Sequence, residues 1–387
     1  MTSRLNFDNL ASEMQTVRRD IHMHPELAFN ETRTSALVLE KLRAWGIEAH
    51  SGIGKTGVVA VIRKGAGPAA IGFRADMDAL PLQEGNSFSH KSIYPQKMHA
   101  CGHDGHTAML LGAARYLHEE ASFNGTVYCI FQPAEEGVGG ALAMMEDGLF
   151  ERFPMSSIFG LHNWPGLAAG EFAVHEGAVM ASTDRIEIKI KGQGGHAAMP
   201  HLGRDPVQAG CALVQAVQSI VSRNLAPVEA GVISITQFHA GDADNIIPEF
   251  AFLGGTIRTF NPAVRAQLAK RLHQICEGIA AAFDLEVNCT VHPGYPPTVN
   301  DVQAAQHCFS AACSVVGQDK ATLNPQPSMG AEDFAYFLQA KPGCYVWLGN
   351  GDAAGGCSLH NPRYDFNDQV IETGIRYWVA LAERLLK

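Results

Sequence analysis

The stretch AAIGFRADMDA, residues 69–79, is a mostly apolar run that ends in two aspartates, and it is typical of a buried β-strand. The next apolar segments are HTAMLLGAARYLHEE at residues 106–120, with helical spacing, and TVYCIFQPAEE at residues 126–136, with strand character. Strand, helix and strand in this order predict an α/β fold. In such sheets, functional residues gather at the carboxyl ends of the strands.

Working outward, further segments follow the same pattern. Strands are expected at TGVVAVIRK (56–64) and SSIFGLHN (156–163), with a short helix at GALAMMEDG (140–148). Polar side chains stand where the expected strands close, and these are Asp76, Asp78, Glu135, Glu136 and His162. The sequence therefore predicts that these side chains meet at one edge of a sheet.

The middle of the chain has a different order of expected strands and helices. Strands and helices are expected in the order βαββαβ, at residues 184–192, 206–225, 231–241, 249–260, 262–283 and 286–294. This order is that of a ferredoxin-like unit. With 387 residues the chain exceeds the usual size of one core, so two domains are expected. We predict an inserted domain at 184–292 and a discontinuous catalytic domain at 1–183 and 293–387, because the last segment has few strands of its own.

Composition limits the function classes. The chain is 46% hydrophobic and 18% charged, as a globular protein is, and its net charge of -10 opposes binding to nucleic acid. No apolar run is long enough for a membrane span, and the first residues lack the apolar region of a signal peptide. The nine cysteines have no framework spacing, which favours reduced thiols and a cytoplasmic location.

The densest group of chemically active side chains is HACGHDGH, residues 99–106. Cys101 and His103 are two residues apart in a glycine-containing stretch before a helix, where a loop could turn both toward one ion. Thiolate and imidazole together favour zinc or a similar transition metal over magnesium or calcium. The alternative is a helix-capping loop with incidental histidines.

Other possible metal donors lie far away in the chain. Glu135 and Glu136 are adjacent, so one carboxylate could bind metal while the other faces the substrate as a base. A solvated acidic strand end is the alternative for this pair. His162 and His360 would each, taken alone, more often be structural, but together with the cysteine and the glutamate they provide enough donors for two metals.

Several ordered motifs carry a family resemblance, namely RADMDALP (74–81), HACGHDGHTAML (99–110), FQPAEEG (131–137), GLHNWPG (160–166), GGHAAMPH (194–201), DNIIP (244–248) and MGAEDFAYF (329–337). The chain resembles the M20 metallopeptidase family. It is most similar to the amidohydrolase branch, with its hippurate hydrolases, N-acyl-amino-acid deacetylases and plant auxin-conjugate hydrolases. The resemblance runs from HMHPELAF, which begins at His22, to the final helix.

The resemblance implies a mixed α/β zinc-peptidase-like catalytic domain with two divalent metal ions, Zn or Mn, Co or Ni. The metal ligands that it implies are Cys101, His103, Glu136, His162 and His360, and the general base is Glu135. It also implies that 184–292 is both a lid and the interface of a homodimer, so that His196 reaches the partner's active site to stabilise the oxyanion. Asn245 and Arg258 are candidates for binding the carbonyl and carboxylate groups of the substrate.

One position departs from the pattern of the peptidase branch. Asp76 stands where that branch has a ligand histidine, and Cys101 with His103 would replace the missing donor, as is usual in the amidohydrolase branch. Which ligand bridges the metals is left open. Asp78 is expected either to orient a metal ligand or to be a simple hydrogen-bonding acid at a strand end.

The expected reaction is hydrolysis of the amide bond of N-acyl amino acids such as hippurate or N-acetyl amino acids, with Glu135 taking the proton from the attacking water. One alternative is a cysteine hydrolase with Cys101 as nucleophile. Another is a non-catalytic metal-binding protein of the same fold. The sequence does not identify the acyl group of the substrate, because the shape of the pocket and not the motifs determines which acyl group binds.

Overall fold

The structure is a computed structural model that describes residues 5–353 and 358–387. The described chain divides into two units. The first contains residues up to Val179 together with Val299–Pro327 and Asp333–Lys387, and the second contains Met180–Thr298 and Ser328–Glu332. The sequence did not predict that Ser328–Glu332 would group with the inserted segment.

The first unit is built on an eight-stranded mixed sheet. In spatial order its strands are β1 (Glu48–Ile53), β2 (Gly57–Lys64), β4 (Gly125–Gln132), β3 (Ala70–Asp76), β5 (Ser157–Pro165), β16 (Gly343–Gly351), β6 (Phe172–Val174) and β15 (Ala321–Leu323). The four neighbours β4, β3, β5 and β16 run parallel to one another. Their carboxyl ends therefore lie at the same edge of the sheet, as the sequence predicted.

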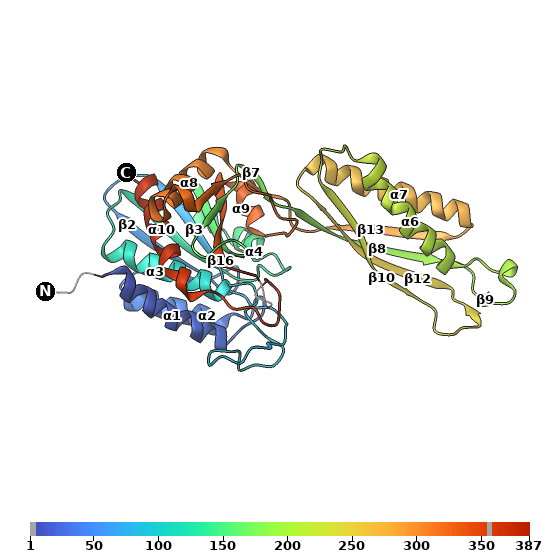
Figure 1. Ribbon diagram of the computed structural model, residues 1–387, viewed down its shortest axis with the longest axis horizontal. Helices are drawn as coiled ribbons and strands as arrows, with labels where there is room; N and C mark the ends of the chain where they lie inside the picture. The colour runs from blue at the N-terminus through green and yellow to red at the C-terminus, as the bar shows by residue number, and fades with distance from the viewer. Residues whose placement is uncertain (1–4, 354–357) are drawn as a thin grey trace. The chain divides into compact units, whose positions relative to one another are not determined.

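Helices cover both faces of this sheet (Figure 1). One face carries α1 (Phe7–Met23), α2 (Thr32–Ala44), α3 (His103–Glu119), α8 (Val302–Val316) and α10 (Ile371–Leu385). The other carries α4 (Gly140–Glu146) and α9 (Phe334–Ala340), and α5 (Leu149–Arg152) follows α4. Because strand side chains alternate, Phe159 points to the first face while Gly160 lets Tyr345 pack closely on the second.

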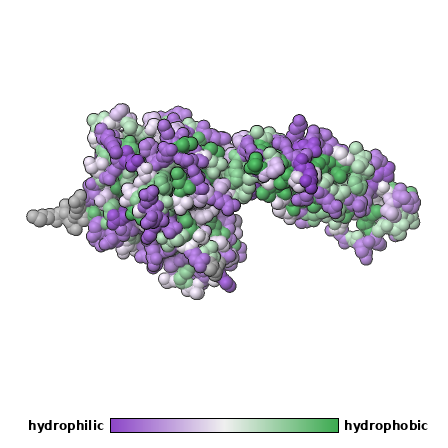
Figure 2. Space-filling model, turned by 45° about the horizontal axis from the view of Figure 1, so that its top comes forward, coloured by the Kyte–Doolittle hydropathy of each residue, from purple (hydrophilic) through white to green (hydrophobic). Residues whose placement is uncertain are grey.

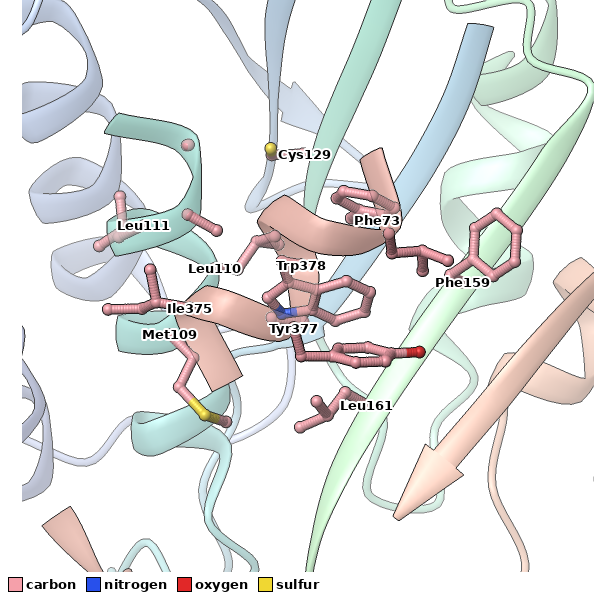
Figure 3. Close-up of a cluster of buried hydrophobic side chains, with 14 of the residues drawn as sticks. Phe73, Met109, Leu110, Leu111, Cys129, Phe159, Leu161, Ile375, Tyr377 and Trp378 are labelled. Carbon is pink, nitrogen blue, oxygen red and sulfur yellow. The ribbon is translucent and has the colours of Figure 1, made fainter. Parts of the chain in front are cut away.

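The main core lies between the sheet and the helices of the first face (Figure 3). Trp378 of α10 packs on Phe73 of β3 with ring centroids 4.6 Å apart, and both side chains are fully buried. Ile375 of the same helix faces Gly112 of α3, where an added Cβ would lie 2.5 Å from Ile375 Cδ1. This close packing fixes α3, and with it the position of the residues at its beginning.

The second unit has a four-stranded antiparallel sheet with two helices on one face (Figure 1). The strands, in spatial order, are β10 (Gly231–Ala240), β12 (Phe250–Thr259), β8 (Ser182–Lys191) and β13 (Glu286–Pro293), and the helices are α6 (Pro206–Asn224) and α7 (Pro262–Phe283). Alternate residues of β8 are buried and the others are half-buried or exposed. The βαββαβ order is that of the predicted ferredoxin-like unit.

Short elements complete the chain. Among the described residues they are β7 (Gly177–Met180), β9 (Gly195–His196), β11 (Ile246–Ile247), β14 (Thr298–Asn300) and 3₁₀ turns at Pro200–Leu202, Gln318–Lys320 and Asp368–Val370. Hydrophobic residues are interspersed among hydrophilic ones on the surface of both units (Figure 2). Within the described ranges, none of the helices combines the length and the apolar character needed to cross a bilayer.

Candidate metal centre

Cys101 lies in the loop that leads into α3, and His103 is the first residue of that helix. Gly102 between them has a φ of 93°, and an added Cβ would lie 2.1 Å from Asn163 Nδ2, so only glycine fits there. The Sγ of Cys101 is 3.4 Å from Nε2 of His162 on β5. The turn therefore brings the thiol to the carboxyl end of the parallel strands.

His103 presents one ring nitrogen to this thiol. Its Nδ1 donates to the backbone oxygen of Asp78 at 2.8 Å, so Nε2 is the nitrogen that could bind a metal once it has lost its proton. Nε2 is buried and has no hydrogen-bond partner among the described residues. The donor atoms of Cys101, His103 and His162 all lie within 4.8 Å of one another.

A second group of donors shares the same sulfur. The donor atoms of Cys101, Glu136 and His360 also lie within 4.8 Å of one another, and Glu136 Oε1 is 3.3 Å from His360 Nε2. His360 has a φ of 59°, unusual for a residue other than glycine, and its backbone N–H donates to Ala100 at 2.7 Å. The structure thus brings together all five side chains that the resemblance implies as ligands.

Glu135 and Glu136 lie in a turn and not, as the sequence suggested, at the end of an extended strand. The strand β4 ends at Gln132, and Ala134 has a φ of 53°. The carboxylate of Asp78 accepts hydrogen bonds from Glu135 N at 3.0 Å and from Glu136 N at 2.9 Å. The turn directs both side chains toward His103, since donor atoms of all three lie within 4.8 Å of one another.

Buried charges surround the imidazoles. Burial by itself lowers the pKa of His103, but the charge of Asp76 and the hydrogen bond to Asp78 outweigh it and raise the pKa to about 10. Burial lowers the pKa of His162 well below its ordinary value, and a charge on His106 lowers it further. The carboxylates therefore favour positive charge beside His103, which a divalent cation would supply.

The donor set fits a transition-metal centre. One thiol, three imidazoles and a carboxylate match the ligands that zinc and related ions prefer. Two of the buried donor atoms, His103 Nε2 and Glu136 Oε1, form no hydrogen bond in the part of the chain that the structure describes, although Glu136 Oε1 lies 3.3 Å from His360 Nε2, another donor of the set. Such buried atoms are costly unless something binds them.

Three other predicted residues belong to the second unit. His196 on β9 pairs with Ile246 on β11, and the backbone oxygen of Asn245 accepts from Ala197 N at 3.0 Å, so His196 and Asn245 are neighbours. Arg258 pairs with Thr183 near the beginning of β8, whereas His196 follows the end of that strand. Within this unit, Arg258 is therefore at the opposite end of the sheet from the other two.

Sequence reasoning missed the residues that form hydrogen bonds next to the candidate ligands. The side chain of Asn163 donates to the backbone oxygen of Cys101 at 2.6 Å and lies 3.0 Å from His106 Nε2, while Tyr364 donates to Asn163 at 2.7 Å. His106 Nδ1 lies 2.6 Å from Asp76 Oδ1. His106 and Asn163 both lie inside quoted motifs, but their spacing does not distinguish a supporting residue from a ligand.

Similar proteins are known for nearly the whole chain. Residues 72–384 match peptidase family M20/M25/M40. Hippurate hydrolase of Campylobacter jejuni is 43% identical over 98% of both chains. N-acetyl-L-cysteine deacetylase of Bacillus subtilis is 37% identical over 99% of this chain and 90% of its own length.

A crystal structure from Bacillus subtilis, described as a dinuclear metal-binding peptidase of the M20 family, has a TM-score of 0.85 at 34% identity and covers 98% of this chain and 99% of that chain. Together with the donor geometry, these similarities confirm the resemblance seen in the motifs. The chain belongs to peptidase family M20/M25/M40 and is a metal-binding hydrolase of its amidohydrolase branch.

Proposed function

We propose that this protein hydrolyses the amide bond of N-acyl amino acids, releasing a carboxylic acid and a free amino acid. The observation that carries the proposal is that five donors from four separate segments come together, four of them around the buried sulfur of Cys101, with Glu135 beside them. The names of the relatives supply the substrate class, because hippurate and N-acetylcysteine are both N-acyl amino acids.

The proposed ligands are Cys101, His103, Glu136, His162 and His360, which would hold two divalent ions, Zn or Mn, Co or Ni. When bound, such ions supply Lewis acidity: they polarise the amide carbonyl and lower the pKa of water toward about 7. Glu135 is buried and lies next to Glu136 in the turn. We assign it to take the proton from the attacking water and to deliver it to the leaving amine.

His196 is proposed to donate a hydrogen bond to the oxyanion of the tetrahedral intermediate. Its Nδ1 accepts from Ala198 N at 3.1 Å, so in the neutral ring the proton is on Nε2. The hydrogen bond therefore fixes the tautomer of the ring, which presents Nε2–H as a donor. Removing one such donor typically costs about 100- to 1,000-fold in turnover.

Arg258 and Asn245 are proposed to bind the substrate's carboxylate and carbonyl groups. The Nη1 of Arg258 donates to Ile257 O at 3.0 Å and also to Thr256 Oγ1. Its other guanidinium nitrogens have no hydrogen-bond partner within residues 5–353 and 358–387, which suits a planar group that pairs with a carboxylate. Amidated substrates should therefore bind far more weakly than free acids.

The proposed assembly is a homodimer through the second unit. Strand β10 is at one edge of its sheet, and its last five residues, Thr236–Ala240, are exposed. Exposed edge strands readily pair with another chain. A cytoplasmic location is proposed as well, because a reducing compartment preserves the thiol of Cys101 as a ligand.

One experiment tests the proposed function. Purified protein is incubated with a panel of N-benzoyl, N-acetyl and N-indoleacetyl amino acids, and the released amino acid is measured before chelation, after chelation and after Zn, Mn, Co or Ni is added back. We expect activity that chelation abolishes and one of these metals restores. Full activity in metal-free protein, or no hydrolysis of any panel member by metal-loaded protein, contradicts the proposal.

The rival in which Cys101 is a nucleophile has one observation in its favour, the 3.4 Å separation of its Sγ from His162 Nε2. A cysteine hydrolase would keep its activity in chelator and lose it to iodoacetamide. We favour the metal centre because Glu136 and His360 approach the same sulfur, and a cysteine and histidine pair does not require them.

A further inference from the structure

The turn that carries Glu135 and Glu136 is held by two buried carboxylates. Three successive backbone N–H groups donate to them: Ala134 to Glu31 Oε1 at 2.9 Å, Glu135 to Asp78 Oδ1 at 3.0 Å and Glu136 to Asp78 Oδ2 at 2.9 Å. The first of these bonds spans 103 positions of the chain. Glu31 lies in the segment that follows the HMHPELAF motif, to which the proposed chemistry assigns no role.

The backbone at the first of these residues needs such support. Ala134 has a φ of 53°, in the left-handed region that is unfavourable for a residue other than glycine. Residues in such conformations persist only where the surroundings determine them. A shift at Ala134 would move the side chain of Glu135, which comes next in the chain.

Glu31 is placed for this task and not for capping its own helix. It occupies the N-cap position of α2, yet its side chain makes no capping hydrogen bond there. Instead, Oε1 accepts from Phe29 N at 3.0 Å as well as from Ala134 N, and Oε2 accepts from Thr56 Oγ1 at 2.6 Å. The side chain is completely buried, and burial raises the pKa of this carboxyl group.

We propose that Glu31 is a positioning residue for the active site: by binding the N–H of Ala134, it fixes the turn that aims Glu135 at the attacking water and Glu136 at the metal. The inference rests on the proposed function. The inference goes beyond the proposed function because it assigns a role in catalysis to the segment before α2. Glu31 itself touches neither substrate nor metal.

Two variants distinguish the effect of the length of the Glu31 side chain from the effect of its charge. Glu31→Gln keeps an oxygen at the distance of Oε1 but removes the charge, whereas Glu31→Asp keeps the charge but withdraws the carboxylate by one methylene. Thr56→Val is the matched control, since it removes a partner of Glu31 without touching the turn. The measurements are kcat and KM on metal-loaded protein, calorimetric affinity of the metal-free protein for Zn²⁺, and the free energy of unfolding.

We expect Glu31→Asp to lower kcat and Zn²⁺ affinity by roughly 10- to 100-fold, as changes to groups that support ligands do, with little change in KM. Glu31→Gln and Thr56→Val should stay near wild type in both. The inference is overturned if folded Glu31→Asp protein keeps wild-type kcat and affinity, or if Glu31→Gln is impaired as strongly as Glu31→Asp. A purely structural role would lower only the free energy of unfolding.

The wild-type protein gives a test that requires no variant. The Ala134 amide should exchange with deuterium slowly, as a buried donor does, and exchange at the rate of an open loop would overturn the inference. Failure of the proposed function would look different. If the correct substrate is not in the panel, the Zn²⁺ affinities and the amide exchange still report on Glu31, whereas wild-type protein that binds no metal would refute the metal centre itself.

Discussion

Cys101 is the side chain common to both groups of metal donors. Its Sγ lies near His103 and His162 in one group and near Glu136 and His360 in the other. A thiolate has the electron pairs to contact two cations at once, so we expect Cys101 to be the shared ligand. The sequence could not decide this point, because it depends on distances between segments that are far apart in the chain.

Glu135 and Glu136 offer the sharpest comparison of neighbouring residues. Glu135→Gln should bind metal normally but lose activity by roughly 100- to 10,000-fold, because an amide cannot take the proton of the attacking water. The matched variant Glu136→Gln should instead lose metal. Metal content by mass spectrometry and turnover of N-acyl amino acids check both, and substantial turnover by metal-loaded Glu135→Gln protein would contradict the assignment.

At the scale of elements, one arginine ties three segments together. Arg18 of α1 is fully buried and contacts Asp104 at the beginning of α3 at 2.8 Å. It also contacts Asp365 and lies 3.4 Å from Asp368, both in the segment that follows His360. The helix that begins at His103 and the segment that carries His360 therefore share one buried counter-ion.

Arg18→Met should destabilise the protein strongly. The change leaves Asp104 buried without its main cation, and breaking a buried ion pair typically costs about 3–5 kcal/mol. Arg19 is the control, since it is 44% exposed and pairs with Asp368 at 2.8 Å at the surface. Arg19→Met should cost no more than about 1 kcal/mol. Urea unfolding checks both values. An equal loss of unfolding free energy in the two variants would refute the role of Arg18 as the main buried counter-ion.

The pH dependence of stability should carry a contribution from His22, which also binds Asp104. Burial by itself lowers the pKa of His22, but Asp104 at 2.8 Å and the hydrogen bond to Glu84 outweigh it and raise the pKa above its ordinary 6.5. The stabilisation of the folded protein by charged His22 is then fully present below pH 6.5 and is lost as pH rises through the higher folded-state pKa.

The pKa of Asp104 is shifted in the opposite direction, so its contribution to stability has the opposite pH dependence. Burial by itself raises its pKa, but Arg18 and His22 hold it well below its ordinary 3.8, so its contribution is lost only as pH falls below that value. The difference in unfolding free energy between wild type and His22→Gln should therefore be largest between 3.8 and 6.5 and should shrink at higher pH. A difference that grows with rising pH would contradict the charged state of His22.

The strands and helices that could be predicted are those with strong local patterns. The parallel strands β3, β4 and β5 and the whole βαββαβ unit follow from apolar periodicity. The acidic residues continue an apolar run, so the sequence predicts strand where the chain turns at Ala134. The carboxylates that hold this turn, Glu31 and Asp78, lie 103 and 57 residues away along the chain from the backbone groups that they bind. The candidate metal donors could be proposed from the sequence because their residue types are rare together, whereas Asn163 and Glu31 make hydrogen bonds that no spacing encodes.

At the scale of the whole molecule, the proposed role of His196 in the partner's site can be tested with mixed dimers. His196→Ala and Glu135→Gln should each be inactive alone. If His196 acts across the dimer, a hybrid purified through two different tags regains one working site, because the Glu135→Gln chain supplies His196 to the chain that has Glu135. A hybrid as inactive as its parents would place His196 in its own chain's site, whereas a His196→Ala protein that is active alone would place His196 outside the chemistry.

The proposed two-ion centre is tested most directly by anomalous diffraction from crystals of the full chain grown with Mn²⁺. We expect two anomalous peaks roughly 3.5 to 4 Å apart, the spacing of two-metal sites. Cys101 should contact both peaks, with His103 and His162 on one side and Glu136 and His360 on the other. A single peak, or peaks bound by other residues, would contradict the centre and the reaction proposed for it.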